Sequence, residues 1–282
     1  MTVQDALLQG TKLLEDERIA APRLTAEVLL AHALQRDRAW LYAHSSDELS
    51  EVGWIHYGRY LHERRGGKPT QYITKRQEFY GREFRVAPAV LIPRPETEHV
   101  VEAALAVIAP GMTVVDVGCG SGAIAVTLAL ETKARVIATD ISEAALRVAA
   151  ENASRLGAQV EFIAADLLDP IRHADVIVCN PPYVPSTDRT VLQREVREFE
   201  PHVALFGGPT GLEIYRRLIA DAPRILENGG HLILELGYNL AEPVRGMLSE
   251  GWSEIRVIPD LAGIPRVLAA QKRYRGGCRA GC

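Results

Sequence analysis

A short loop that combines an amide, two prolines and an aromatic ring is the segment of this chain best suited to chemistry. Asn180-Pro181-Pro182-Tyr183 follows the apolar run 176–179, which predicts a buried parallel strand. Open α/β sheets bind ligands at the carboxyl ends of such strands. Two consecutive prolines fix φ and remove two backbone donors. The stiff loop would present the Asn180 oxygen, a carbonyl and the ring together, a set that suits a planar group bearing an NH2.

The same tetrapeptide also has a plainer interpretation. Asn-Pro often opens a turn, and a tyrosine after a turn often serves only packing. Short motifs of this kind arise by chance, so Asn180 to Tyr183 alone do not decide between a turn and a site. The rest of the chain has to decide.

A glycine-rich turn follows another apolar run, at 113–117, and precedes a helical pattern. Glycines let the backbone approach a ligand closely, and a helix N-terminus offers free N–H groups. The turn could therefore hold a pyrophosphate or a carboxylate. Its first glycines, with Ala123, also fit the dinucleotide-binding pattern, so a nicotinamide cofactor stays open. The predicted cofactor-binding residues here are Gly118, Cys119, Gly120, Ser121 and Gly122.

Acidic residues end the next two predicted strands. Asp140 comes about 20 residues after the glycine turn, where a carboxylate can accept hydrogen bonds from ribose hydroxyls of either cofactor. Asp166, followed by Leu167, is placed to accept from the amino group of an adenine. Asp140 could instead help to cap the helix that begins near Ser142. Because strand ends of one sheet share an edge, the set as a whole favours a binding crevice.

The surrounding elements predict an α/β protein with a helical N-terminal region. Residues 1–75 carry apolar residues at helical spacing. Residues 76–95 alternate apolar and polar positions around Gly81, as in a β-hairpin, and Pro95 can start the next helix. From 96 onward helical and strand patterns alternate, which is typical of a parallel sheet. The expected strands are 113–117, 135–139, 160–164, 175–179, 231–236, 254–258 and 266–271.

Composition limits the class of protein. The 282 residues are 47% hydrophobic with a formal net charge of −4, which argues against extensive duplex binding. No bilayer-spanning run and no signal peptide are evident. The four cysteines suggest no disulfide framework, so we expect a cytoplasmic protein.

Scattered histidines predict no metal site. The tail, 274–282, with Cys278 and Cys282, is expected to be disordered.

Two of these motifs carry a family resemblance. The segment 116–122, Asp-Val-Gly-Cys-Gly-Ser-Gly, resembles the first motif of class I S-adenosylmethionine-dependent methyltransferases. The loop from Asn180 to Tyr183 resembles the catalytic motif of those that methylate planar nitrogens, such as adenine N6, guanine N2 and glutamine N5. A nicotinamide dehydrogenase has no need of such a loop.

Almost the whole chain resembles one group of these enzymes, the PrmC/HemK family of peptide chain release factor glutamine methyltransferases. The most specific segment is 92–98, Ile-Pro-Arg-Pro-Glu-Thr-Glu, because the related ribosomal-protein enzyme continues differently after its Pro-Arg pair. Further segments that match in order are Gln71-Tyr72-Ile73, Glu78-Phe79-Tyr80-Gly81, Glu200-Pro201, Gly211-Leu212, Glu235-Leu236-Gly237 and Arg266-Val267.

The resemblance implies a fold, a cofactor and a partner. The fold would be the Rossmann-like, seven-stranded, mostly parallel methyltransferase domain at 96–273, joined by the hairpin to a substrate-recognition domain at 1–75. S-adenosylmethionine would be bound without a metal, and S-adenosylhomocysteine would be the product. The substrate would be the glutamine of the Gly-Gly-Gln loop of bacterial class I release factors. We expect a monomer with no membrane and no stable nucleic-acid partner.

The resemblance also implies residue roles. Asn180, Pro181 and Tyr183 would be catalytic and, with Pro182, would bind the substrate amide. Asn180 would also border the cofactor, and Leu167 stands where many members have an aromatic residue. Arg94 is undecided between a hinge and a ligand contact, while Glu200-Pro201 is expected to shape the loop after the catalytic motif.

Other functions remain open from the sequence. A nucleic-acid N6-adenine or N2-guanine methyltransferase could use the same loop on a flipped base, and would show a basic channel near Tyr183. A ribosomal-protein glutamine methyltransferase is a second alternative. A non-catalytic nucleotide-binding module is a third, since fold alone does not fix function.

Overall fold

The computed structural model describes residues 1–274 and divides the chain into two compact units. The first combines Met1–Arg76 with Gln193–Phe199, and the second combines Gln77–Leu192 with the chain from Glu200 onward. Nearly all of the expected tail, with Cys278 and Cys282, lies outside the described residues. The sequence groups 193–199 with the α/β region, whereas the structure groups them with the helices.

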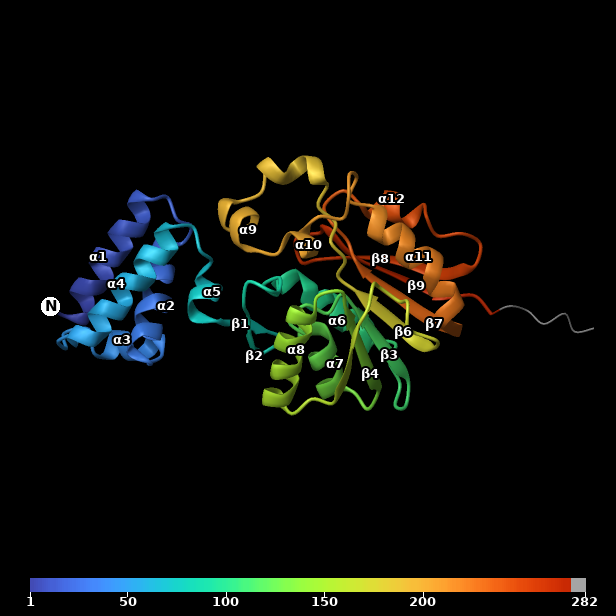
Figure 1. Ribbon diagram of the computed structural model, residues 1–282, viewed down its shortest axis with the longest axis horizontal. Coiled ribbons are helices and arrows are strands. Elements are labelled where there is room, and N and C mark those ends of the chain that lie inside the picture. The colour runs from blue at the N-terminus through green and yellow to red at the C-terminus, as the bar shows by residue number, and fades with distance from the viewer. Residues whose placement is uncertain (275–282) are drawn as a thin grey trace, which may run out of the picture. The chain divides into compact units, whose positions relative to one another are not determined.

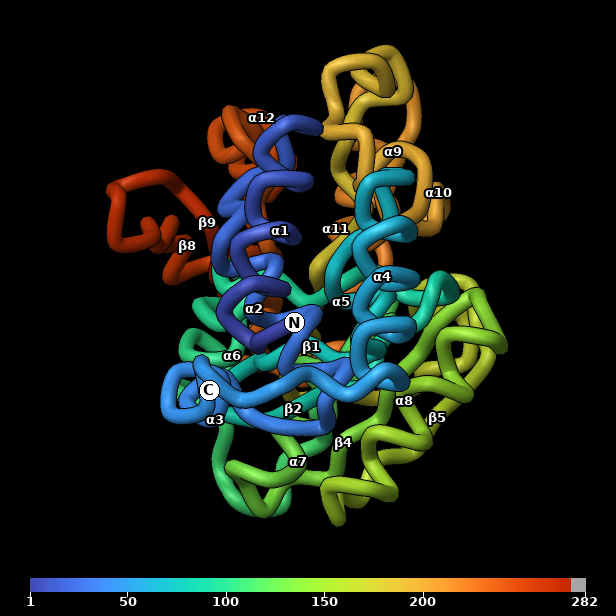
Figure 2. The backbone as a smooth tube through the Cα atoms, turned by 90° about the vertical axis from the view of Figure 1, so that its left-hand side faces the viewer, coloured from blue at the N-terminus to red at the C-terminus, as the bar shows by residue number. Residues whose placement is uncertain are grey.

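The first unit is a small helical bundle. Thr2 caps the first helix in a reciprocal box with Asp5, and Ser50 caps the fourth. Figures 1 and 2 show α1, α2 and α4 side by side, and their apolar faces form one buried cluster that includes Leu14, Leu29 and Tyr57. The elements are α1 (Val3–Asp16), α2 (Pro22–Leu34), α3 (Arg38–Ala43), α4 (Glu51–Arg65), α5 (Thr70–Thr74) and α9 (Arg194–Phe199).

The last of these helices comes from a distant part of the sequence. Glu195 of α9 forms an ion pair with Arg64 of α4, whose side chain is buried. The backbone of Gly67 also lies against Arg194 and Phe199. These contacts explain why a short segment near residue 195 belongs to the helical unit.

The second unit is built on the expected seven-stranded sheet. Its strand order is β5-β4-β3-β6-β7-β9-β8, and β9 runs antiparallel to both of its neighbours, β7 and β8. Five parallel strands leave their carboxyl ends at one edge. The strands are β3 (Thr113–Val117), β4 (Arg135–Asp140), β5 (Val160–Ala164), β6 (Ala174–Cys179), β7 (Leu226–Glu235), β8 (Trp252–Pro259) and β9 (Pro265–Lys272).

The expected start of β7 was wrong by five residues. The sequence predicts a strand from 231, but β7 begins at Leu226 and includes Gly229 and Gly230. A glycine pair normally indicates a turn. Here the pairing with β6 shifts register between Ala174 and Val176, so the irregular stretch is kept within the strand.

Helices cover both faces of this sheet (Figure 1). Alternate residues of β3 point to opposite faces, so Val114 joins one buried cluster and Val115 the other. The first cluster lies under α6 (Glu98–Leu105), α7 (Ala123–Glu131) and α8 (Glu143–Leu156), and the second under α11 (Glu213–Ile225) and α12 (Ala241–Arg245). The short elements η1 (Pro95–Thr97), η2 (Ser186–Thr190) and α10 (His202–Leu205) lie in the loops.

A hairpin precedes the sheet, as the alternating pattern predicts. It consists of β1 (Arg76–Phe79) and β2 (Arg82–Arg85), and both turn residues, Tyr80 and Gly81, have positive φ. Positive φ at both central residues is typical of two-residue hairpin turns, whose twist matches the right-handed twist of the flanking strands. Phe79 and Phe84 pack edge to face in the core of the α/β unit.

Within residues 1–274, no helix has the length and apolarity needed to cross a membrane.

Candidate active site

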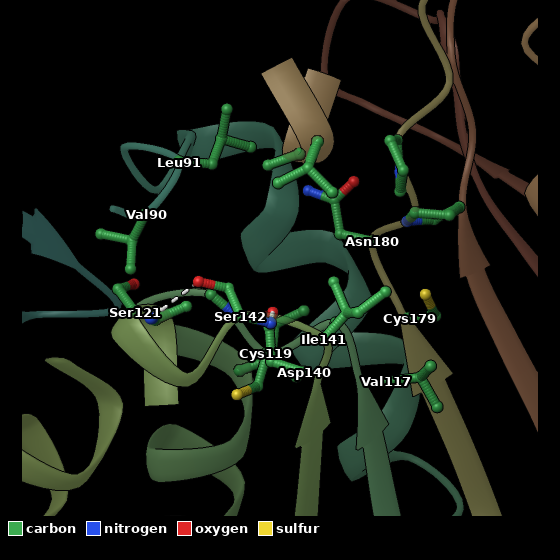
Figure 3. A pocket seen from close by; sticks show the side chains of 18 of the residues that line it. Val90, Leu91, Val117, Cys119, Ser121, Asp140, Ile141, Ser142, Cys179 and Asn180 are labelled. Carbon is green, nitrogen blue, oxygen red and sulfur yellow. Dashed lines mark hydrogen bonds between the residues drawn. The ribbon is translucent and has the colours of Figure 1, made fainter. Parts of the chain in front are cut away.

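One cavity of about 250 Å³ opens at the carboxyl ends of β3, β4 and β6 (Figure 3). It brings together most of the residues that the sequence predicts for the site. Gly122 and Tyr183 are exceptions, because neither lines the cavity. The predicted residues that do line it are Gly118, Cys119, Gly120, Ser121, Asp140, Asp166, Leu167, Asn180, Pro181 and Pro182.

The glycine turn has the backbone that its sequence requires. Gly118 and Gly120 have φ of 71° and 54°, in the left-handed region that favours glycine. A Cβ on either would meet no other atom within 4 Å, so the space beside both is open to a ligand. A Cβ on Gly122 would instead press against Ala149 of α8. Gly122 therefore allows close packing of the helices beneath the turn.

Asp140 holds the turn in place. Its Oδ2 accepts a hydrogen bond from the Gly120 N–H at 2.9 Å, and its Oδ1 accepts from Ser142 N–H at 2.8 Å. Ser142 caps α8 with its own hydroxyl. The helix-start interpretation of Asp140 is thus correct in part. Each carboxylate oxygen can still accept a second hydrogen bond from a ligand in the cavity.

Asp166 has a partner that the sequence does not indicate. Its Oδ2 accepts from Arg217 of α11 at 2.8 Å, and Arg217 also lines the cavity. The adjacent Leu167 has a positive φ of 53°. Its carbonyl accepts from the Thr139 hydroxyl at 2.9 Å, which fixes this strained position.

These residues fit S-adenosylmethionine. The open glycine backbone can accommodate the amino-acid portion of the cofactor, because its N–H groups and the start of α7 favour a carboxylate. Asp140 supplies acceptors for ribose hydroxyls, and Asp166 an acceptor for an amino group. Ile141 and Leu167 provide apolar walls for a flat base. The donor and acceptor types therefore match the three parts of the cofactor.

Burial keeps the two cysteines near the cavity unreactive. The pKa of each thiol, at Cys119 and Cys179, is raised well above its usual value because burial disfavours the thiolate. Behind the turn, Asp116 is fully buried and accepts from Ala125 N–H at 3.0 Å. Burial raises the pKa of Asp116 to about 7.

The loop from Asn180 is held by residues that sequence reasoning missed. Asn180 Nδ2 donates to the Thr97 hydroxyl at 3.1 Å, and that hydroxyl donates to Glu235 at 2.6 Å. The Tyr183 hydroxyl reaches the other Glu235 oxygen at 3.3 Å. A signal was present, because Glu235 is an acidic residue at the end of a predicted buried strand, like Asp140.

The Tyr183 ring lies against the core of the sheet. It packs with the second buried cluster, and a Cβ on Gly237 would collide with it. Burial raises the pKa of its hydroxyl above the usual range. Stacking of this ring on a substrate amide therefore stays a prediction.

Glu200 fastens the segment before α6. Its buried carboxylate accepts from Arg94 and from the Ile92 N–H, the latter at 3.1 Å. Arg94 also lines the cavity. Arg94 thus belongs both to an internal ion pair and to the cavity wall, and Glu200 fixes a segment 106 residues earlier in the chain.

Gly207 gives a test of how closely the catalytic loop is packed. A Cβ there would overlap the Pro182 carbonyl oxygen. Gly207→Ala should therefore displace the loop, lowering stability by about 1–3 kcal/mol and turnover by up to about 10²-fold. Thermal unfolding and methyl-transfer rates measure the two effects. Gly58 lies in α4, and a Cβ there would meet no atom within 4 Å. Gly58→Ala should therefore leave turnover unchanged. A Gly207→Ala protein with normal stability and turnover would refute the close packing.

Solved structures of methyltransferases share the fold of much of this chain. A methyltransferase from Pyrococcus furiosus aligns with 72% of this chain and 94% of its own, with a TM-score of 0.53 and 19% identity. The Thermus thermophilus 16S rRNA N2 G1207 methyltransferase, in complex with AdoMet and guanosine, aligns with 70% of this chain and 50% of its own (TM-score 0.53, 20% identity). These likenesses confirm the class I methyltransferase fold.

Sequence comparison matches two segments of the chain to known families. Residues 5–74 match the PrmC N-terminal domain, and residues 99–200 match the methyltransferase small domain. The release factor glutamine methyltransferase of Koribacter versatilis is 47% identical over 96% of this chain and 99% of its own. That of Moorella thermoacetica is 42% identical over 97% and 99%. The chain therefore belongs to the release factor glutamine methyltransferase family.

Proposed function

We propose that this protein methylates the N5 side-chain nitrogen of a glutamine in a peptide chain release factor, with S-adenosylmethionine as the donor. The observation that carries the proposal is the shared cavity. The glycine turn with Asp140 and the Asn180-Pro181-Pro182 loop border one space, so a cofactor and an amide acceptor can meet there. The names of the relatives supply the class of acceptor.

The chemistry needs orientation more than a strong base. S-adenosylmethionine, when bound, supplies a methyl group on a positively charged sulfur. An amide nitrogen is a weak nucleophile, so Asn180 Oδ1 and the Pro181 carbonyl would accept its two N–H groups and fix its direction. These acceptors also stabilise the positive charge that develops on the nitrogen during attack. Holding the reacting atoms in line supplies much of the remaining rate, and the product can lose its proton to water.

The charges around the cavity favour a protein acceptor over nucleic acid. The charged residues that line it are Arg94, Asp140, Asp166 and Arg217. Both arginines are paired with carboxylates, Arg94 with Glu200 and Arg217 with Asp166. A site that follows a phosphate backbone needs unpaired Lys and Arg, and this cavity wall does not offer a net positive charge.

Further parts of the proposal concern the partner. We assign the acceptor to the glutamine of the Gly-Gly-Gln loop of class I release factors, and recognition of the factor to the helical region 1–75. The methyltransferase region would be 96–273, with the hairpin region 76–95 between them. We expect the protein to act as a monomer in the cytoplasm, without a metal.

A labelled-methyl assay tests the function. The protein is incubated with methyl-labelled S-adenosylmethionine and a purified bacterial class I release factor, and peptides are analysed by mass spectrometry. We expect one methyl group on the glutamine of the Gly-Gly-Gln loop. A release factor with that glutamine changed to alanine should take up no label. Labelling of ribosomal RNA or DNA, with the release factor unmodified, would overturn the proposal.

A further inference from the structure

Three residues from separate elements form one hydrogen-bonded chain beside the cavity. Asn180 follows β6 and Glu235 ends β7, and these strands are parallel neighbours with Cys179 opposite Leu234. Thr97, at the start of α6, lies between them. Its hydroxyl accepts from Asn180 Nδ2 at 3.1 Å and donates to Glu235 Oε2 at 2.6 Å. Thr97 is 4% exposed and Glu235 2%, so bulk water does not compete.

The hydroxyl has only one proton, which sets the direction of the chain. An ionised carboxylate only accepts hydrogen bonds, so the Thr97 proton is committed to Glu235. The hydroxyl can then only accept from Asn180, and the amide group facing it must be the NH2. Asn180 Oδ1 is left as the free atom, and it takes no hydrogen bond from any other residue in the described part of the chain.

We infer that Thr97 and Glu235 are positioning residues that fix the Asn180 amide with its oxygen, and not its NH2, free for the acceptor. The inference rests on the proposed function, because a substrate amide must donate both of its N–H groups to the site. An Asn180 side chain turned by 180° would present a donor to a donor. The carboxylate at Glu235 therefore determines, through one hydroxyl, the polarity of the catalytic loop.

The surroundings of Glu235 make this control sensitive to pH. Burial raises the pKa of Glu235 to about 7, against the hydrogen bonds from Thr97 and Tyr183 and the charge of Arg266, which lower it. The charge of Glu96 raises it further, and the Tyr215 hydroxyl and Cys179 thiol are the other titratable neighbours. Below about pH 7 the carboxyl becomes protonated and can itself donate to Thr97, which removes the constraint.

Substitutions at Thr97 test this relay, the hydrogen-bonded chain from Glu235 through Thr97 to Asn180. Thr97→Val keeps the side-chain shape but removes the hydroxyl, and should lower kcat for release factor methylation about tenfold or more. The affinity for S-adenosylhomocysteine, measured by calorimetry, should change less than about threefold, because the cofactor side of the cavity is untouched. Thr97→Ser retains the hydroxyl and should recover most of kcat. The wild-type kcat should fall below about pH 7, whereas Thr97→Val should lose this acid limb.

A matched control is available in α7. Thr127 is as buried as Thr97, but its hydroxyl has no hydrogen-bond partner among residues 1–274. Thr127→Val should keep wild-type kcat and the wild-type pH profile. Wild-type kcat in Thr97→Val would overturn the relay. Loss of S-adenosylhomocysteine affinity in parallel with kcat would also overturn it, because that outcome indicates a structural effect on the cofactor site.

The orientation can also be measured without turnover. The chain has four asparagines, Asn152, Asn180, Asn228 and Asn239, so asparagine-selective ¹⁵N labelling gives four side-chain NH2 signals. The Asn180 signal is identified by its absence in Asn180→Asp. It should shift in Thr97→Val and stay in place in Thr127→Val. An Asn180 signal unmoved by Thr97→Val would refute the relay. This result does not depend on turnover. Failure of the wild type to methylate a release factor would refute only the proposed function.

Discussion

Replacing Asn180 with alanine is expected to lower kcat for release factor methylation by about 10²–10³-fold, the usual cost of removing one preorganised polar group that stabilises developing charge. The side-chain oxygen is the acceptor left free beside the cavity, since its NH2 is bound to Thr97. The cofactor contacts assigned to the glycine turn and Asp140 do not depend on it. S-adenosylhomocysteine affinity should therefore stay within about threefold of the wild type.

Single-turnover kinetics and calorimetry separate the two effects of this change. Asn228→Ala is a suitable control, because Asn228 is exposed in the first half of β7, away from the strand ends that border the cavity. It should match the wild type in both measurements. If Asn180→Ala mainly weakened cofactor binding and kept kcat, the acceptor role of Asn180 would be wrong.

Removal of the Glu200 carboxylate is expected to cause the largest loss of stability. Glu200→Ala leaves Arg94 without its carboxylate and the Ile92 N–H without its acceptor. Breaking a buried pair from one side costs about 3–5 kcal/mol. Because about a third of the Arg94 side chain is exposed, we expect about 2–4 kcal/mol.

Thermal unfolding of the α/β unit checks this loss, at roughly 2–4 °C for each kcal/mol. Glu161→Ala breaks an exposed ion pair between Glu161 of β5 and Arg135 of β4. It should lower the free energy of unfolding by less than about 1 kcal/mol. Glu200→Gln, which keeps one acceptor, should fall between the two. An unfolding temperature for Glu200→Ala equal to that of Glu161→Ala would show that Arg94 finds a replacement partner.

Local patterns predicted the sheet and the strand-end residues that line the cavity. The glycine turn could be predicted because its positive φ values require glycine at Gly118 and Gly120. Asp140 and Asp166 could be predicted because each lies at the carboxyl end of a strand, Asp140 as the last residue of β4 and Asp166 two residues after β5. Family resemblance then narrowed the expected acceptor from any planar NH2 group to a glutamine side chain. Relatives that align over nearly their full length confirmed the family.

The contacts among the supporting residues could not be predicted in this way, because the topology joins distant segments. Thr97 and Glu235 are 138 residues apart, and Asn180 is 83 residues from Thr97. Their contact exists because β6 and β7 are parallel neighbours and α6 begins beside their carboxyl ends. Glu200 was expected to shape its own loop, yet it bonds the segment around Ile92. Spacing along the sequence contains no signal for such pairings.

The return of the chain to the helical bundle at residues 193–199 limits how this protein can be dissected. Five helices before residue 76 and α9 form one unit, so a cut near residue 76 would remove most of the bundle and leave α9 behind. Glu195 would then lose Arg64. The bundle cannot be deleted, exchanged or grafted as a simple terminal cassette, and a chimera has to exchange both segments together.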